Sequence, residues 1–298
     1  MPSLEVLHSY CAVVEEGGFR AAAARRHCSQ PAISQQIKAL ERELGRVLLD
    51  RKRRRPTPAG QMLYMRARGI LNDADALARE LEDFDETAEH ELRVGTSDTT
   101  ALYFLPPFVR QFASAMPNTH LKVVDRPSEA IAEQVVRGDL DLGIVTLPVV
   151  HAELEQRELF KERLVLVAPA EHRLGGRRRA RLDTVHDEPF VLLEAGTRTG
   201  AILRDYFRRE SFDPQVVVDS GSFEVIKRYV AEGIGLSFLP EIVITDADNT
   251  LTTIHVPGVP KVHIGAIWRR GAYQTRAECA FLDMITKRSG PPTAPHCR

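Results

Sequence analysis

The 298-residue chain has the composition of an ordinary globular protein, with 43% hydrophobic residues, 27% charged residues and a net charge of -1. No run approaches the ~18 to 20 apolar residues that a membrane-spanning helix needs, and the N-terminus lacks the basic and then apolar pattern of a signal peptide. We therefore expect a cytoplasmic protein of two or three domains, with no membrane partner.

Charge is unevenly distributed along the chain. Residues 1–60 hold eleven Lys or Arg against six Asp or Glu, and residues 61–90 hold three against eight. This asymmetry predicts a basic head, an acidic neck and a nearly neutral body with separate roles. The four cysteines are Cys11, Cys28, Cys279 and Cys297. They have no CxxC or other metal-ligand spacing, so we expect neither a metal site nor another cofactor.

The first 45 residues predict three helices. Apolar residues recur at helical spacing over 4–15, and an alanine-rich second helix follows over 19–27. After a break at Ser29, Pro31 is placed in the first turn of a third helix, where its missing N–H costs nothing, and Gly45 ends that helix. Two helices joined by so short a turn are a helix-turn-helix candidate.

The third helix has an uncharged, hydrogen-bonding face opposite Ile33, Ile37 and Leu40. Gln and Ser side chains can pair with base edges in the major groove, and a recognition helix presents its N-terminal residues there. The alternative is a polar surface helix that happens to be rich in Gln, and this helix alone does not separate the two interpretations. The candidate DNA contacts are Ser29, Gln30, Pro31, Ser34 and Gln35, with Lys38 placed for a phosphate.

Five consecutive cations, residues 51–55, follow the third helix. Pro56 and Pro58 then favour extended backbone, which predicts a short basic hairpin, or wing, lying along DNA phosphates. A charge run is usually a solvated face, but its place beside a groove-reading helix favours DNA binding. The candidate phosphate contacts of the wing are Arg51, Arg53, Arg54 and Arg55.

Residues 1–60 resemble the winged helix-turn-helix of LysR-type transcriptional regulators. The matching residues are Phe19, Ala22, Ala23, Ser29, Gln30, Pro31, Ala32, Ser34, Ile37, Leu40, Glu41, Leu44, Gly45, Leu48, Arg51, Thr57 and Gly60. The resemblance implies sequence-specific binding to double-stranded promoter DNA, with RNA polymerase as a further candidate partner. Gln35 departs from the family, which commonly has a basic residue there, and this affects the expected base preference.

A long helix is expected from Pro58 to about Glu89. Its apolar residues are spaced alternately by four and three over residues 63–84, and a seam of this spacing is typical of a helix that packs against a partner helix. The alternative is that the helix packs against its own domain. The family resemblance implies a dimerising linker and a homodimer or homotetramer. The candidate dimerisation residues are Leu63, Ile70, Leu77, Leu81 and Phe84.

From Glu91 onward, short apolar strands alternate with helices, which predicts an α/β sheet. The phrases "RGDLDLGIV" and "VAEGIGLSFLP" match the two-lobed, periplasmic-binding-protein-like regulatory domain of the same family. The expected organisation is a winged helix-turn-helix over 1–60, a linker helix over 61–89, a regulatory domain over 90–290 and a disordered tail over 291–298. Within the regulatory domain, lobe I takes about 90–164 and 266–290, and lobe II about 165–265.

Small hydroxyl side chains follow the predicted strands of this domain. Open α/β sheets bind ligands outside the carboxyl ends of their strands, and helix N-termini there favour anions. By analogy with the family, these side chains would line an effector cleft between the lobes. Each one alone is more often a helix cap, so we expect about half of them to contact a ligand. The candidates are Ser97, Thr99, Thr100, Ser128, Thr146 and Thr197.

Two other classes of protein were weighed. An enzyme is disfavoured because the chain has no HExxH, GxSxG or phosphate-loop motif. A solute-binding protein without a DNA role would fit the body alone, but the basic head and the missing export signal count against it. The sequence therefore predicts a non-enzymatic regulator in which a small, anionic effector favours one of two arrangements of the lobes.

Overall fold

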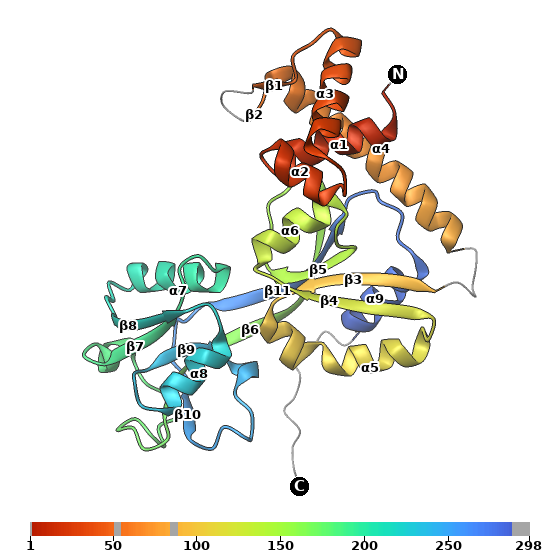
Figure 1. Ribbon diagram of the computed structural model, residues 1–298. Coiled ribbons are helices and arrows are strands. Elements are labelled where there is room, and N and C mark those ends of the chain that lie inside the picture. Colours follow the sequence, from red (N-terminus) through yellow and green to blue (C-terminus); the bar gives the residue numbers. More distant parts are fainter. Residues whose placement is uncertain (1, 51–54, 84–88, 288–298) are drawn as a thin grey trace. The chain divides into compact units, whose positions relative to one another are not determined.

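The computed structural model describes residues 2–50, 55–83 and 89–287 (Figure 1). The chain divides into two compact units, residues 1–86 and 87–298, and each is described by itself. The elements of the first unit are α1 (Leu4–Glu15), α2 (Phe19–Arg25), α3 (Gln30–Leu44), β1 (Leu49–Asp50), β2 (Arg55–Pro56) and α4 (Pro58–Glu82). All three helices expected in the head are present.

Local signals in the sequence set the ends of these helices. The hydroxyl of Ser3 accepts a hydrogen bond from the Val6 amide and caps α1. Gly45 ends α3 in the left-handed region, with φ of 62°. The hydroxyl of Thr57 accepts from the Gly60 amide at 3.1 Å and caps α4.

A buried carboxylate joins three helices of the head. The side chain of Glu15, on α1, is 4% exposed. It accepts hydrogen bonds from Arg25 of α2 at 2.7 Å and from the Tyr64 hydroxyl of α4 at 3.1 Å, and Arg68 of α4 lies 3.5 Å away. Several donors therefore compensate the cost of burying this charge.

The expected seam along α4 is divided. Leu63 and Ala67 pack with Leu7, Cys11 and Leu71 in the head's own core, so the alternative of packing on its own domain holds for the first half. The later positions are exposed: Ile70 by 51%, Leu77 by 58% and Leu81 by 62%. The first half of the seam therefore packs on the head and the second half is exposed, and contact of Leu63 with a partner helix stays a prediction. Helix α4 ends at Glu82, and Phe84 lies outside the described residues.

The second unit is the expected two-lobed α/β structure. Its elements are β3 (His90–Thr96), η1 (Thr100–Phe104), α5 (Pro106–Ala115), β4 (Thr119–Asp125), α6 (Ser128–Arg137), β5 (Leu142–Thr146), β6 (Leu154–Pro169), η2 (Leu182–Val185), β7 (Pro189–Leu193), α7 (Arg198–Arg209), β8 (Gln215–Ser220), α8 (Phe223–Ala231), β9 (Ser237–Pro240), η3 (Glu241–Val243), β10 (Leu251–Ile254), β11 (Lys261–Arg269) and α9 (Arg276–Lys287).

Two long antiparallel strands connect the lobes. The main sheet has the order β10-β6-β11-β5-β3-β4, with β9 also paired to β6, while β7 and β8 form a separate parallel pair. Residues 154–163 of β6 pair with β11, and residues 164–169 pair with β9 and β10. Figure 1 shows β6 and β11 passing from the first lobe (α5, α6, α9) to the second (α7, α8). Any change in the angle between the lobes therefore bends these two strands.

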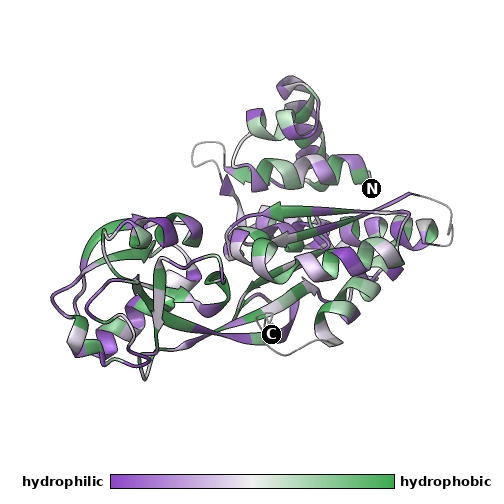
Figure 2. Cartoon of the chain, turned by 90° about the horizontal axis from the view of Figure 1, so that it is seen from below, coloured by the Kyte–Doolittle hydropathy of each residue, from purple (hydrophilic) through white to green (hydrophobic). Residues whose placement is uncertain are grey.

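Apolar residues concentrate on the strands of this unit, whereas its helices alternate apolar and polar faces (Figure 2). Each lobe has its own core. Phe112 and Phe281, both fully buried, meet edge to face between α5 and α9 of the first lobe. Phe190 and Phe238 stack in the second. Two cores joined by two strands can keep their packing while the lobes move.

Some elements differ from the expectation. The segment "YFLPPFVRQFASAMP" predicts one helix over 103–117, whereas the structure has a π-helical turn, η1, followed by α5, because Pro106 begins a new helix and cannot donate to the preceding turn. The segment "RLVLVAP" predicts a strand from Arg163, whereas β6 begins nine residues earlier, at Leu154. Exposed polar residues over 155–158 hid the alternation there, and the sequence does not predict β10.

Candidate functional sites

The polar face of α3 is accessible, as the sequence predicted. Gln30, Pro31, Gln35 and Lys38 are exposed and Ser34 is half-buried. The apolar face is buried, with Ile33, Ile37 and Leu40 no more than 1% exposed. Ser29 is exposed, but its hydroxyl accepts from the Ala32 amide at 3.3 Å and caps the helix. One predicted DNA contact therefore has a structural role of its own.

A two-stranded hairpin follows α3. Leu49 pairs with Pro56, and Asp50 with Arg55, whose side chain is exposed. Arg51, Arg53 and Arg54, at the tip of the predicted wing, lie outside the described residues.

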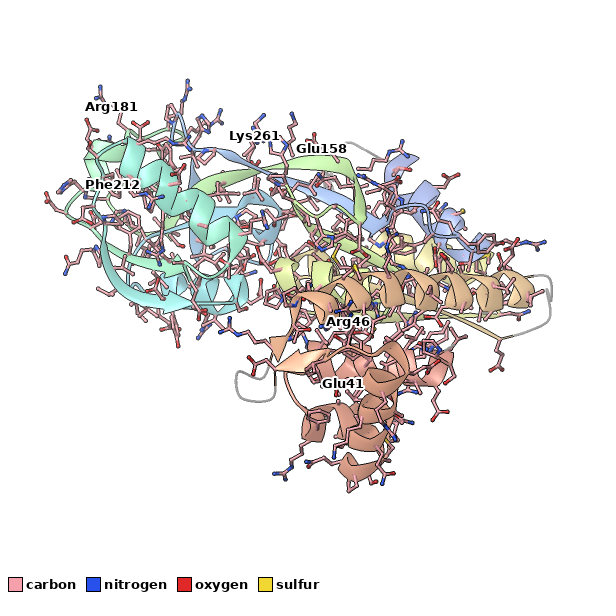
Figure 3. All side chains as sticks on the ribbon, turned by 90° about the horizontal axis from the view of Figure 1, so that it is seen from above. Glu41, Arg46, Glu158, Arg181, Phe212 and Lys261 are labelled. Atoms are coloured by element: carbon pink, nitrogen blue, oxygen red, sulfur yellow. The ribbon has the colours of Figure 1, made fainter. Side chains whose placement is uncertain are left out.

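A carboxylate fixes the path from α3 into this hairpin. Glu41, labelled in Figure 3, accepts hydrogen bonds from the backbone amides of Leu48 at 2.8 Å and Leu49 at 3.3 Å. Leu48 and Leu49 are themselves buried in the head's core. The start of the hairpin is therefore held against the helix that presents Gln30 and Ser34.

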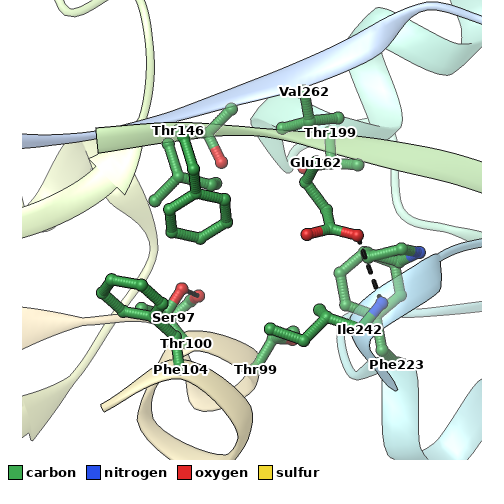
Figure 4. A pocket seen from close by; sticks show the side chains of 13 residues that line it. Ser97, Thr99, Thr100, Phe104, Thr146, Glu162, Thr199, Phe223, Ile242 and Val262 are labelled. Atoms are coloured by element: carbon green, nitrogen blue, oxygen red, sulfur yellow. Dashed lines mark hydrogen bonds between the residues drawn. The ribbon is translucent and has the colours of Figure 1, made fainter. Parts of the chain in front are cut away.

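The six hydroxyl residues predicted in the regulatory domain line two adjoining pockets between the lobes. The inner pocket, of about 420 Å³ measured out to its mouth, is lined by Ser97, Thr99, Thr100, Phe104, Thr146, Phe160, Glu162, Thr199, Phe223, Pro240, Ile242, Val262 and Ile264 (Figure 4). The outer pocket, of about 960 Å³, is lined by Ser97, Asp98, Thr99, Asp125, Arg126, Pro127, Ser128, Glu129, Thr146, Leu193, Thr197, Arg198, Thr199, Gly221, Ser222 and Phe223. Both figures include solvent space at the mouths. The cavity volume proper is about 370 Å³ in the outer pocket, which is that of a small-molecule site, and about 50 Å³ in the inner pocket, which is room for a small group.

Sheet topology brings the hydroxyls together. Strands β3 and β5 are parallel neighbours, so Ser97, which follows β3, lies near Thr146 at the end of β5. Ser128 begins α6, and its hydroxyl accepts from the Thr146 amide at 3.2 Å. The hydroxyls of Ser97 and Thr100 lie 3.3 Å apart. The carboxyl-edge rule therefore located this group correctly.

Thr197 has a role in the fold that explains its residue type. Its hydroxyl accepts from the Gly200 amide at 3.1 Å and donates to the Glu194 carbonyl at 2.8 Å, so it caps α7. Thr199, two residues later, lines both pockets, and the sequence analysis missed it. No sequence signal separates these two hydroxyls, because both lie at the start of a helix.

Glu162, which the sequence did not single out, also lines the inner pocket. The residue is 7% exposed, and a carboxyl oxygen accepts from the Ile242 amide at 3.1 Å. Burial raises the pKa of this carboxyl to about 7, although the Ile242 amide acts in the opposite direction. A signal was present: Phe160, Leu164 and Leu166 share its side of β6 and are buried, so alternation placed a carboxylate among inward-facing residues.

Polar contacts cross the cleft at its mouth. Arg198 of α7 forms an ion pair with Glu129 of α6 at 2.9 Å, and it also donates to the Pro148 carbonyl. The Ser222 hydroxyl donates to Asp98 at 3.1 Å. These contacts join the two lobes in the arrangement described here.

A third contact between the lobes involves Tyr103 of η1. Its hydroxyl donates to Glu224 of α8 and accepts from the Lys227 ammonium at 2.9 Å. Lys227 also contacts Asp248 at 3.3 Å. The ammonium of Lys227 is thus held away from the two pockets by partners of its own.

The chain was compared with family models and known proteins. The model described as "LysR substrate binding domain" matches residues 85–290, and "Bacterial regulatory helix-turn-helix protein, lysR family" matches residues 4–61. A "Probable hydrogen peroxide-inducible genes activator" of Streptomyces viridosporus is 31% identical over 91% of this chain and 89% of its own length.

Two solved structures are similar at 25% sequence identity. A full-length OxyR variant from Pseudomonas aeruginosa covers 95% of this chain and 94% of its own, with a TM-score of 0.68. The regulatory domain of Synechocystis CcmR, in complex with 2-PG, covers 68% of this chain and 99% of its own, with a TM-score of 0.63. Over the described residues, no helix is long and apolar enough to span a membrane, and no cluster of three or more His, Cys, Asp or Glu could hold a metal ion.

Proposed function

Because the chain belongs to the LysR family of DNA-binding transcriptional regulators, we propose that a small molecule bound between its two regulatory lobes controls how it acts on promoter DNA. The observation that carries this proposal is the pair of adjoining pockets at the carboxyl ends of β3 and β5. They lie between two separately packed lobes that two long strands connect, so a ligand there contacts both lobes.

The DNA contacts are proposed on α3 and the hairpin after it. Gln30, Ser34 and Gln35 would meet base edges, since they are accessible and their amide and hydroxyl groups can pair there. Lys38 and Arg55, both exposed, would contact phosphates. We assign Ser29 chiefly to capping α3.

The second half of α4 is proposed as the dimerisation surface. Ile70, Leu77 and Leu81 are large apolar side chains that are more than half exposed on one helix. Their spacing of seven and four residues places them along one side, where a second copy of α4 would bury them. Light scattering on the full chain tests this, because a monomer at micromolar concentration contradicts it.

An acceptor-rich, anionic group is proposed for the part of the effector in the outer pocket. The hydroxyls of Ser97, Ser128 and Thr146, together with the cations Arg126 and Arg198, can donate to it. The 2-PG complex of the CcmR regulatory domain supports a small-molecule effector. A thiol-based peroxide response in the cleft is not supported, because the sequence has no cysteine between Cys28 and Cys279.

The ligand controls the protein only if it binds one arrangement of the lobes better than the other. The contacts at the cleft mouth, among them Arg198 with Glu129 and Ser222 with Asp98, distinguish two such arrangements, because opening the cleft breaks them. An effector that bridges the lobes would add to these contacts and favour closure.

A gel-shift assay with DNA from the protein's own promoter region tests the proposal. We expect salt-sensitive, sequence-specific binding, and a change in affinity or footprint when a metabolite that thermally stabilises the full chain is added. Binding with no preference for the promoter, or stabilising metabolites that leave DNA binding unchanged, would contradict it.

A further inference from the structure

Only one of the residues that line the inner pocket is ionisable. Five carry hydroxyl groups and seven are apolar, while Glu162 alone can carry a charge. The outer pocket differs, since it contains both Arg126 and Arg198 alongside acidic residues. Those acidic residues are Asp98, Asp125 and Glu129, so an effector that fills both pockets meets charges of both signs at one end and a single carboxyl group at the other.

The carboxyl group of Glu162 faces the inner pocket. In Figure 4, one oxygen accepts the hydrogen bond of the Ile242 amide, and the other points into the open space between Thr146 and Thr99. The residue paired with it across β11, Val262, is apolar. The free side of the carboxyl group is thus available to a ligand.

The nearby cations are committed elsewhere. Arg163, the next residue on β6, forms an ion pair with Glu241 of η3 at 2.7 Å. Lys227 of α8 contacts Tyr103, Glu224 and Asp248. Among the described residues that line the pocket from β11, η1 and α8, none is cationic. Ionised Glu162 therefore has no protein cation within the pocket to compensate its charge.

Aromatic rings complete the surroundings of this carboxyl group. Phe104 and Phe160 are both buried, with ring centroids 4.6 Å apart, and Phe223 lines the pocket from α8. A carboxylate beside aromatic rings is an environment that stabilises an organic ammonium ion, by charge pairing and by cation–π attraction.

We propose that the inner pocket binds the ammonium group of the effector through Glu162, so that the effector class is an amino-carboxylate or another amine that carries an anionic group. This inference rests on the proposed function, since it places the anionic end in the outer pocket. If the proposal is correct, Glu162 gives the site its preference for an effector with an ammonium group over an organic anion without one.

The titration of Glu162 predicts how the affinity for an ammonium ion changes with pH. Burial, and to a lesser extent the charge of Glu241, raise the pKa of Glu162, while the Ile242 amide and Arg163 lower it, and the net pKa is about 7. Near neutral pH, and with the pocket empty, the Glu162 carboxyl group is therefore protonated in a part of the molecules. A bound ammonium favours the ionised carboxylate, so its binding releases that proton and its affinity rises with pH up to about 8.

Propylammonium chloride is the first probe, because its ammonium group can occupy the inner pocket without an anionic end. At about 100 mM and pH 8 it should raise the Tm of the full chain by about 1 to 3 °C relative to sodium chloride at equal ionic strength. Sodium propionate can bind only in the outer pocket, so any rise that it causes should be the same in the Glu162→Gln variant. The Glu162→Gln variant should lose the effect of propylammonium, whereas Glu158→Gln, which removes a charge on the same strand outside the pocket, should retain it.

Three results would overturn the inference: no stabilisation specific to propylammonium, equal stabilisation of Glu162→Gln, or stronger stabilisation by propionate as the pH falls. The last would mean that protonated Glu162 donates to an anion.

A second probe series separates this inference from the proposed function. Amino-carboxylates of three to six carbons are compared with dicarboxylates of the same length, by thermal shift and by gel shift. If the protein binds its promoter and responds to dicarboxylates but not to amines, the proposed function is supported and the assignment of an ammonium site is contradicted. If ammonium ions bind but amino-carboxylates leave DNA binding unchanged, the ammonium site is supported and the proposed control of DNA binding by the effector is contradicted.

Discussion

Glu15 in the helical head and Glu162 in the two-lobed unit are both buried carboxyl groups, but their surroundings differ. Glu15 meets Arg25, Tyr64 and Arg68, from two other helices, and faces no pocket found in the described residues. Glu162 is held by the backbone amides of Ile242, at 3.1 Å, and Arg163, and the pocket that it lines has no cationic side chain. A buried charge surrounded by donors serves the fold, whereas one with a side open to a cavity is available to a ligand.

The largest effect is expected from removing the compensated carboxylate. Glu15→Ala takes away the acceptor shared by three helices and should destabilise the head by about 3 kcal/mol. Far-UV circular dichroism during urea unfolding should show an early transition. Fluorescence of Trp268, the single tryptophan, should be unchanged because it reports the regulatory unit.

Glu16→Ala is the matched control, since Glu16 contacts the same Arg25 at 3.2 Å but is more exposed. It should cost less than about 1 kcal/mol. If the two variants behaved alike, Glu15 would not be the centre of the head's packing.

The second variant removes the uncompensated carboxyl group. Because the pKa of Glu162 is raised from 4.5 to about 7, the folded state binds this proton more tightly than the unfolded state. Stability therefore falls as pH rises through this window, by up to about 3 kcal/mol. Glu162→Gln should stabilise the regulatory unit above pH 7, and the difference should vanish near pH 4.5.

Urea unfolding followed by Trp268 fluorescence at pH 4.5, 6 and 8 measures this difference. If Glu162→Gln destabilises the regulatory unit at pH 8, then Glu162 is a compensated charge like Glu15, and the contrast between the two residues is contradicted.

On the surface of the head, two exposed residues can be compared in the same way: Gln30 on α3 and Arg55 on the hairpin. Gln30→Ala should reduce promoter affinity by about 1 to 3 kcal/mol and relax base preference, because its amide can read a base edge. Arg55→Ala should weaken promoter and random DNA equally and reduce the salt slope by about 1. Competition gel shifts at several salt concentrations distinguish them, and identical profiles would show that α3 does not read the bases.

The smallest effects should separate two neighbouring hydroxyls. Thr197→Ala removes the cap of α7 and should cost about 1 kcal/mol of stability. Thr199→Ala should change stability by less than about 0.5 kcal/mol and instead reduce effector binding, since Thr199 lines both pockets. Denaturation and ligand titration of the same two variants check this, and a reversed pattern would exchange their roles.

Much of the fold could be predicted because its signals are local. Ser3, Ser29 and Thr57 cap helices where the sequence places them, and Gly45 ends α3. The collection of hydroxyls in the cleft was also predictable, since parallel strands bring their carboxyl ends to one edge of a sheet. These inferences needed no knowledge of distant contacts.

The remainder depended on tertiary structure. The division of α4, with Ala67 buried and Ile70 exposed, follows from where α1 packs, and the spacing of apolar residues does not contain that information. Glu162 was missed because "FKERLVLVAP" looks like a charged turn before a strand, whereas β6 already runs through it. The Ile242 amide that meets Glu162 comes from 80 residues later in the chain.

The most direct test of the contrast between the two carboxylates is a titration of the Glu162 carboxyl carbon by NMR, assigned with Glu162→Gln, with and without propylammonium. We expect a midpoint near pH 7, moving to lower pH when the amine is present. A midpoint near 4.5, or one that the amine leaves unchanged, would contradict the assignment of Glu162 as an open site for an ammonium ion.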